Sequence, residues 1–105
     1  MKKFLLLIIC TALPAVLAAQ RYGVSGRVFV QGTETPIGQA VVELPREGLW
    51  AVADGNGNFS LKGVPAGKTV FTVSSLGYVT TATEVVVRAN MDSLVLYAPE
   101  DNLKL

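Results

Sequence analysis

Asp54-Gly55-Asn56-Gly57-Asn58-Phe59 decides the fold of this 105-residue chain, because it predicts a tight reversal of the backbone between two short β-rich segments. Glycine and asparagine reach positive φ at low cost, and an aspartate can accept hydrogen bonds from the backbone that follows it. Residues 49–53 and 58–61 flank the turn with β-forming side chains. The stretch therefore predicts a hairpin between these two segments.

Two further turn signals follow at short range, Val64-Pro65-Ala66-Gly67 and Leu76-Gly77-Tyr78. Pro65 sets φ for the first central position of a turn, and Gly67 suits its exit. The remaining β-rich segments are 22–31, 40–44, 68–76, 78–88 and 93–97. About seven strands with a turn signal every 8–12 residues are typical of a β-sandwich. We therefore expect an all-β fold, a seven-stranded antiparallel β-sandwich.

The N-terminus has the pattern of a secretory signal peptide. Lys2 and Lys3 precede an apolar run, and small residues follow it, so we expect residues 1–19 to be removed by cleavage after Ala18 or Ala19. The alternative, a membrane anchor, is disfavoured because residues 4–19 fall short of the roughly 20 apolar residues that span a bilayer. The expected domains are a signal peptide (1–19), one β-sandwich (20–98) and a linker or tail (99–105).

Composition argues against most catalytic and nucleic-acid functions. The chain has nine Lys and Arg against eight Asp and Glu, and without Lys2 and Lys3 it is close to neutral, so neither nucleic acid nor an acidic membrane surface is an expected partner. It has no histidine, and its single cysteine, Cys10, lies in the predicted signal peptide. Catalysis by Ser-His-Asp or Cys-His groups and ordinary zinc sites are therefore excluded. We expect no enzyme activity, no cofactor and no metal.

A calcium loop is the alternative interpretation of the first turn. Asp54, Asn56 and Asn58 match the first ligands of an EF-hand loop, which also needs glycine at its sixth position and glutamate at its twelfth. Phe59 and Pro65 stand at those positions. The turn is therefore better explained by Asp54 binding its own backbone.

The aromatic residues Trp50 and Tyr78 are the remaining candidates for a binding surface. We expect both rings to pack across the sandwich. The alternative is that Trp50, together with Arg46 and Leu49, forms an exposed contact for a glycan or a protein, since an amphipathic ring can stack on a sugar.

The order of motifs along the chain resembles the carboxypeptidase-regulatory-like domain. Val24-Ser25-Gly26-Arg27-Val28 comes first, and Thr35-Pro36-Ile37-Gly38-Gln39-Ala40-Val41-Val42 comes second. The three turn motifs then follow at the spacing of the family. The resemblance covers about residues 22–97, and it implies a non-catalytic sandwich of the prealbumin, or transthyretin, type.

Such domains are accessory modules of secreted or surface proteins. One frequent setting is the N-terminus of TonB-dependent outer-membrane receptors of Bacteroidota, where the module follows a signal peptide and precedes the TonB box, plug and barrel. The resemblance then implies protein partners, either the plug and barrel or periplasmic coupling proteins. It also implies a place at the periplasmic face of the outer membrane, with membrane association only through downstream domains. The alternatives are a free-standing secreted module that binds carbohydrate or protein, and a structural domain of an adhesin.

Overall fold

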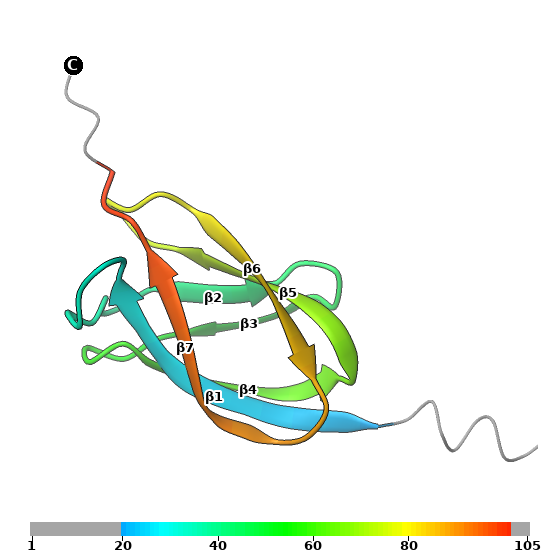
Figure 1. Cartoon of the computed structure of the whole chain (residues 1–105). Coiled ribbons are helices and arrows are strands. Elements are labelled where there is room, and N and C mark those ends of the chain that lie inside the picture. The colour runs from blue at the N-terminus through cyan, green and yellow to red at the C-terminus, as the bar shows by residue number, and fades with distance from the viewer. Residues whose placement is uncertain (1–19, 102–105) are drawn as a thin grey trace, which may run out of the picture.

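The computed structural model describes residues 20–101, so the predicted signal peptide and the last residues of the predicted linker lie outside it. The described residues form two packed sheets (Figure 1). The seven strands are β1 (Arg21–Val30), β2 (Val41–Leu44), β3 (Leu49–Val52), β4 (Asn58–Pro65), β5 (Gly67–Ser74), β6 (Thr81–Val87) and β7 (Met91–Ala98). This architecture confirms the predicted all-β sandwich. Between residues 20 and 101 there is no helix of the length and hydropathy that crossing a membrane requires.

The two sheets differ in size. The strand order is β4-β1-β7 in the three-stranded sheet and β3-β2-β5-β6 in the four-stranded sheet. Four of the five strand pairs are antiparallel, as expected, but β1 and β7 pair in parallel. A parallel pair cannot be closed by a tight turn, and β7 is reached from β6 in the opposite sheet. The antiparallel expectation is therefore wrong for this one pair.

The hairpin predicted around the Asp54 turn is not formed. β3 pairs with β2, and β4 pairs with β1, so the turn connects two different sheets. The turn itself is present, because the Gly57 N–H donates to the Asp54 carbonyl at 3.0 Å and Gly57 has a φ of 80°. Turn chemistry specifies a reversal of the chain. It does not specify which strand the outgoing segment pairs with.

The second predicted turn is also a crossing between sheets. β4 continues to Pro65, past its predicted end at Leu61, and only Ala66 separates it from β5 in the other sheet. Gly63 has a φ of 72° and lies at a bulge in the β1–β4 ladder, where the register shifts. Gly67 has a φ of 110°, which explains the glycine at the exit of the crossing.

The core lies between the two sheets and follows the alternation of each strand. On β1, Val24, Val28 and Val30 are buried, whereas Arg27 and Phe29, which alternate with them, face outward. The largest fully buried side chains include Phe71 and Leu96. Each such side chain contributes about 1.5–3 kcal/mol to stability relative to exposure in water.

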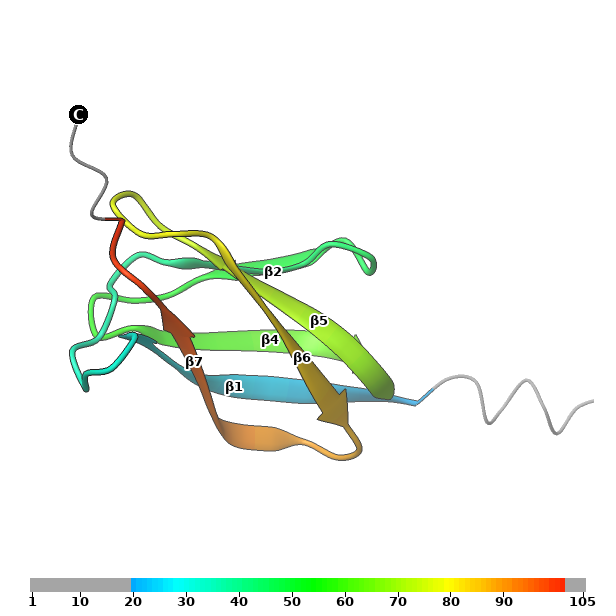
Figure 2. The same cartoon turned by 45° about the horizontal axis from the view of Figure 1, so that its top comes forward.

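Connecting segments gather at the two ends of the sandwich, as Figures 1 and 2 show. Residues 31–39, 54–57, 75–80 and 99–101 lie at one end, and the chain enters β1 at the other. We expected the linker to leave the sheet after Ala98, but residues 99–101 stay attached to the fold. The Val79 N–H donates to the Pro99 carbonyl at 2.9 Å, and the Asp101 N–H donates to the Gly77 carbonyl at 3.0 Å. The chain is therefore held at this end as far as residue 101.

Candidate functional site

The unequal size of the sheets leaves one strand partly uncovered. β6 is the edge of the four-stranded sheet, and β7 is the edge of the three-stranded sheet. Figures 1 and 2 both show β6 and β7 on the same side of the sandwich. Of the β6 side chains that alternate toward the inner face, Val87 is buried, but Thr81, Thr83 and Val85 are only half-buried. The beginning of β6 is therefore accessible from the side of β7.

A groove of about 590 Å³ occupies this region. It is bounded by the segment that follows β1, the beginning of β6 and the second half of β7. Its lining residues are Gln31, Gly32, Thr33, Glu34, Thr81, Thr83, Val95, Leu96 and Tyr97. Glu34 is the single charged side chain among them. A smaller cavity of about 330 Å³ shares Gln31 and Thr33 with the groove and adds Glu100 to the acidic side chains of this surface.

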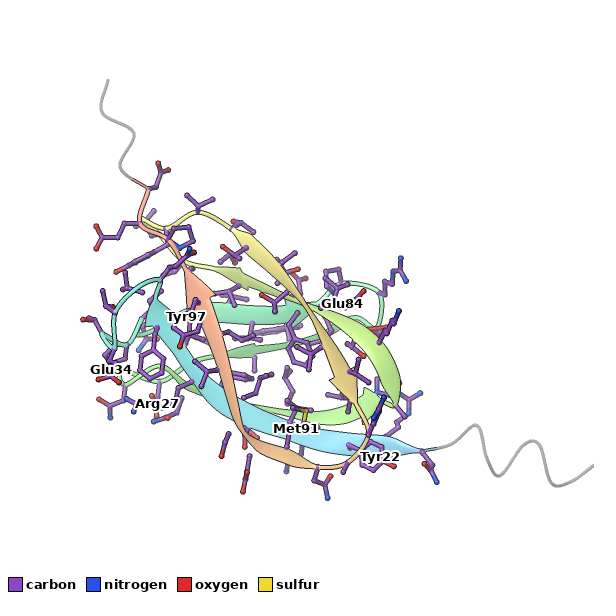
Figure 3. The ribbon with its side chains drawn as sticks, in the orientation of Figure 1. Tyr22, Arg27, Glu34, Glu84, Met91 and Tyr97 are labelled. Atoms are coloured by element: carbon purple, nitrogen blue, oxygen red, sulfur yellow. The ribbon has the colours of Figure 1, made fainter. Side chains whose placement is uncertain are left out.

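Tyr97 is held at the groove by neighbours on the outer face of the three-stranded sheet. Phe29 of β1 lies opposite it in the ladder, and their ring centroids are 6.2 Å apart with the planes inclined by 37°. The Arg27 guanidinium lies over the Phe29 ring, 5.1 Å from its centroid, and donates to the Asn56 carbonyl. Figure 3 shows Glu34, Arg27 and Tyr97 on the same side of the domain. This stack positions the Tyr97 ring, which is 46% exposed.

The predicted contact residues Trp50, Arg46 and Leu49 lie away from the groove lining. Trp50 is on the edge strand β3 and is 66% exposed, so the expectation that it packs across the sandwich is wrong. Leu49 packs against the core, and Arg46 is exposed in the turn between β2 and β3. Tyr78 packs against the core, as expected. A binding role for Trp50, Arg46 and Leu49 stays a prediction.

Asp54 binds its own turn, which the sequence suggested. Its Oδ1 accepts the N–H groups of Asn56 at 2.9 Å and Asn58 at 3.0 Å, and its Oδ2 accepts the Asn58 amide at 3.4 Å. These bonds, chiefly the one from the Asn58 backbone, lower the pKa of the Asp54 carboxyl below its ordinary 3.8, and the Arg27 charge adds to the effect. Within residues 20–101, no three His, Cys, Asp or Glu side chains are grouped to hold a metal.

The lowered pKa of Asp54 predicts a pH-dependent contribution to stability. A depressed folded pKa stabilises the fold above the ordinary value of 3.8, and this contribution is lost as the pH falls through the lower folded pKa. Asp54→Asn keeps an oxygen acceptor for the turn but does not titrate. Urea unfolding should therefore show the wild type more stable at pH 7, with the difference shrinking between about pH 5 and about pH 2. A difference that is constant over this range would contradict the assignment.

The groove residues were missed by sequence reasoning, although the alternation of the strands contains a signal for them. Val28 and Val30 face the core, so Phe29 must face outward, and the buried Leu96 likewise places Tyr97 on the outer face. That the two rings meet depends on the parallel β1–β7 pair. The groove offers hydroxyl groups, apolar surface and a carboxylate. These groups suit binding, and no pair of a nucleophile and a histidine base exists in this chain.

Comparisons with known proteins show what the chain is similar to. A model of the family described as CarboxypepD_reg-like domain matches residues 24–105. A chain from the crystal structure of a C-terminal interface mutant of a type II cohesin-X-dockerin complex from Acetivibrio cellulolyticus is 26% identical, with a TM-score of 0.62 over 73% of this chain and 56% of that one. A chain from the corresponding N-terminal interface mutant is 24% identical, with a TM-score of 0.64, and the match covers 80% of this chain and 61% of that one. No curated protein matches. The alignments thus span less than two thirds of either structural relative.

Proposed function

The chain belongs to the CarboxypepD_reg-like domain family, and from this premise we propose that it is a non-catalytic, protein-binding accessory module. We place it at the N-terminus of a TonB-dependent outer-membrane receptor for nutrient uptake, on the periplasmic side of the membrane. Its partners there are the receptor's own plug and barrel or periplasmic coupling proteins. The module would position the energy-coupling segment that follows it.

The attachment of residues 99–101 to the loop at 77–79 is the observation that carries this proposal. Tyr78 and Glu100 form an antiparallel bridge, and the bonds to Gly77 and Val79 flank it. A segment that continues beyond residue 101 therefore starts from a fixed point. This point lies at the end of the sandwich opposite the start of β1 (Figure 1). The similar structure at 26% identity is that of a cohesin-X-dockerin complex, which agrees with a protein-binding role.

The coding sequence that follows Leu105 in the genome tests the receptor assignment. We expect a TonB box, a plug and a barrel, either in frame or across a frameshift. If none of these follows Leu105, the receptor assignment is wrong, whereas the family membership stands.

Exposure of Trp50 favours a second function, a free-standing secreted module that binds a glycan. The ring lies on an edge strand beside Val52, which is 49% exposed, and opposite Glu43. A ring, an adjacent apolar side chain and a carboxylate are groups with which proteins recognise sugars.

A glycan array probed with the wild type and with Trp50→Ala tests this alternative. The secreted-module function predicts binding by the wild type that falls about fivefold in the variant, since stacking on an aromatic ring contributes on the order of 1 kcal/mol. Val86→Ala is the control, because Val86 is also exposed but lies on β6, at the opposite edge of the same sheet. Absence of binding by the wild type would count against the alternative.

A further inference from the structure

We propose that the free edge of β7 accepts an extended strand from a partner protein, and that this strand carries alternating β-branched residues and a lysine or arginine. The inference rests on the proposed protein-binding function and adds to it the surface and the chemistry of the partner. The site is the groove between β6 and β7.

The geometry of the two sheets points to a missing strand. The four-stranded sheet ends in β6, but the three-stranded sheet opposite it ends in β7. An additional strand beside β7 would give four strands in each sheet. It would lie in the groove and cover Thr81 and Thr83, which are inward-facing but only half-buried.

The backbone of β7 is oriented to receive such a strand. The Ala98 carbonyl accepts the N–H of Gln31, which continues from β1, so Ala98 directs its backbone groups toward β1. Successive residues of a strand direct their N–H and C=O groups to alternate sides. The backbone groups of Tyr97 and Val95 therefore point toward the free edge. A partner strand can form ladder hydrogen bonds with these two residues.

The other sheet edges are less suitable for pairing. β4 carries a bulge at Gly63 and the exposed Lys62, and β3 has only four residues. The free edge of β6 carries Glu84 at its centre. Bulges, short strands and charges are the features that protect edges from pairing. Residues 94–98 of β7 contain no charged residue and no proline, and their register with β1 is continuous.

The side chains around the edge define the partner. Residues of the added strand that face inward meet Leu96 and the methyl groups of Thr81 and Thr83, and those that face outward lie beside Val95 and Tyr97. β-branched residues suit both positions. Glu34 in the lining and Glu100 in the adjoining cavity, with no basic side chain in either lining, favour a cationic group on the partner.

The chain's own described residues take up this side only beyond the end of β7, where the Val79 N–H donates to the Pro99 carbonyl. Residues 99–101 run antiparallel to residues 79–77, so that they proceed away from Thr81 and from the groove. None of residues 20–101 therefore supplies a strand to the groove, and we assign that strand to a partner.

Titration of the purified ¹⁵N-labelled protein with synthetic peptides tests this inference. The probe has about eight residues, alternating valine and threonine with a lysine at each end, which matches the length of β7. One control peptide has glutamate in place of lysine. The other carries N-methyl groups on the amides that would donate to β7, which removes the ladder bonds and keeps the side chains.

We expect amide shifts at Val95, Tyr97 and Thr83 with the lysine peptide, binding about tenfold weaker for the glutamate peptide, and none for the N-methylated peptide. Glu34→Gln should weaken binding of the lysine peptide about threefold, and Glu47→Gln, in the turn between β2 and β3, should leave it unchanged. Equal binding of the N-methylated peptide, shifts confined to β3, or no binding of the lysine peptide would each overturn the inference. These results do not depend on the sequence after Leu105, so a failure of this inference can be distinguished from a failure of the receptor assignment.

Discussion

Gly26→Ala is expected to destabilise the domain by about 3 kcal/mol or more, which is a large part of the stability of a small domain. A Cβ atom at Gly26 would lie 1.8 Å from the Leu94 carbonyl oxygen and 2.6 Å from the Leu94 carbonyl carbon. Both are backbone atoms of β7, so no side-chain rotation relieves the contact. The β1 and β7 strands must separate locally, and this is the pair that holds the free edge of β7 in place.

Gly23→Ala is the matched control for this substitution. Gly23 lies on the same strand, but a Cβ atom there has its nearest neighbours at 3.9 Å. Its free energy of unfolding in urea should change by less than about 1 kcal/mol. Similar values for the two variants would show that the close approach of β1 and β7 is not as described.

Gly57→Val is expected to cost about 3 kcal/mol as well, through two separate effects. Gly57 has a φ of 80°, where a β-branched residue is strained by about 1–3 kcal/mol. A Cβ atom would also lie 2.7 Å from the Val28 carbonyl oxygen and 3.2 Å from the Pro36 Cβ. The Gly57 carbonyl accepts the Val28 N–H at 2.9 Å, so a displaced turn would also lose this bond.

The two effects can be separated with alanine substitutions and urea unfolding. Gly32 has a φ of 81°, and a Cβ atom there would meet nothing within 4 Å. Gly32→Ala therefore measures the conformational cost alone, about 1 kcal/mol. Gly57→Ala should cost clearly more, and equal costs would show that the turn does not pack on β1 and Pro36.

Local chemistry made most of the elements predictable. The β-rich segment 22–31, which alternates around Val24, Val28 and Val30, was predicted as a strand and corresponds to β1. The glycines at 57, 67 and 77 identified the turns, and all three have positive φ. These properties depend on residues a few positions apart, so they can be read from the sequence.

Strand pairing and the groove could not be predicted in this way. The Asp54 turn has hairpin chemistry, yet β3 pairs with β2 and β4 pairs with β1, in different sheets. The close approach of Gly26 to Leu94 depends on the parallel pair of the first and last strands. The groove arises because the two sheets differ by one strand, a property of the whole fold that no single segment contains.

An immunoblot of fractionated cells of the native host tests the central claim, that this domain is the accessory module of a larger receptor. The antibody is raised against residues 20–101, the part that the structure describes. The account predicts a single band of the outer-membrane fraction that is several times larger than the 105-residue chain. A band no larger than the chain itself, found in the culture medium, would contradict it.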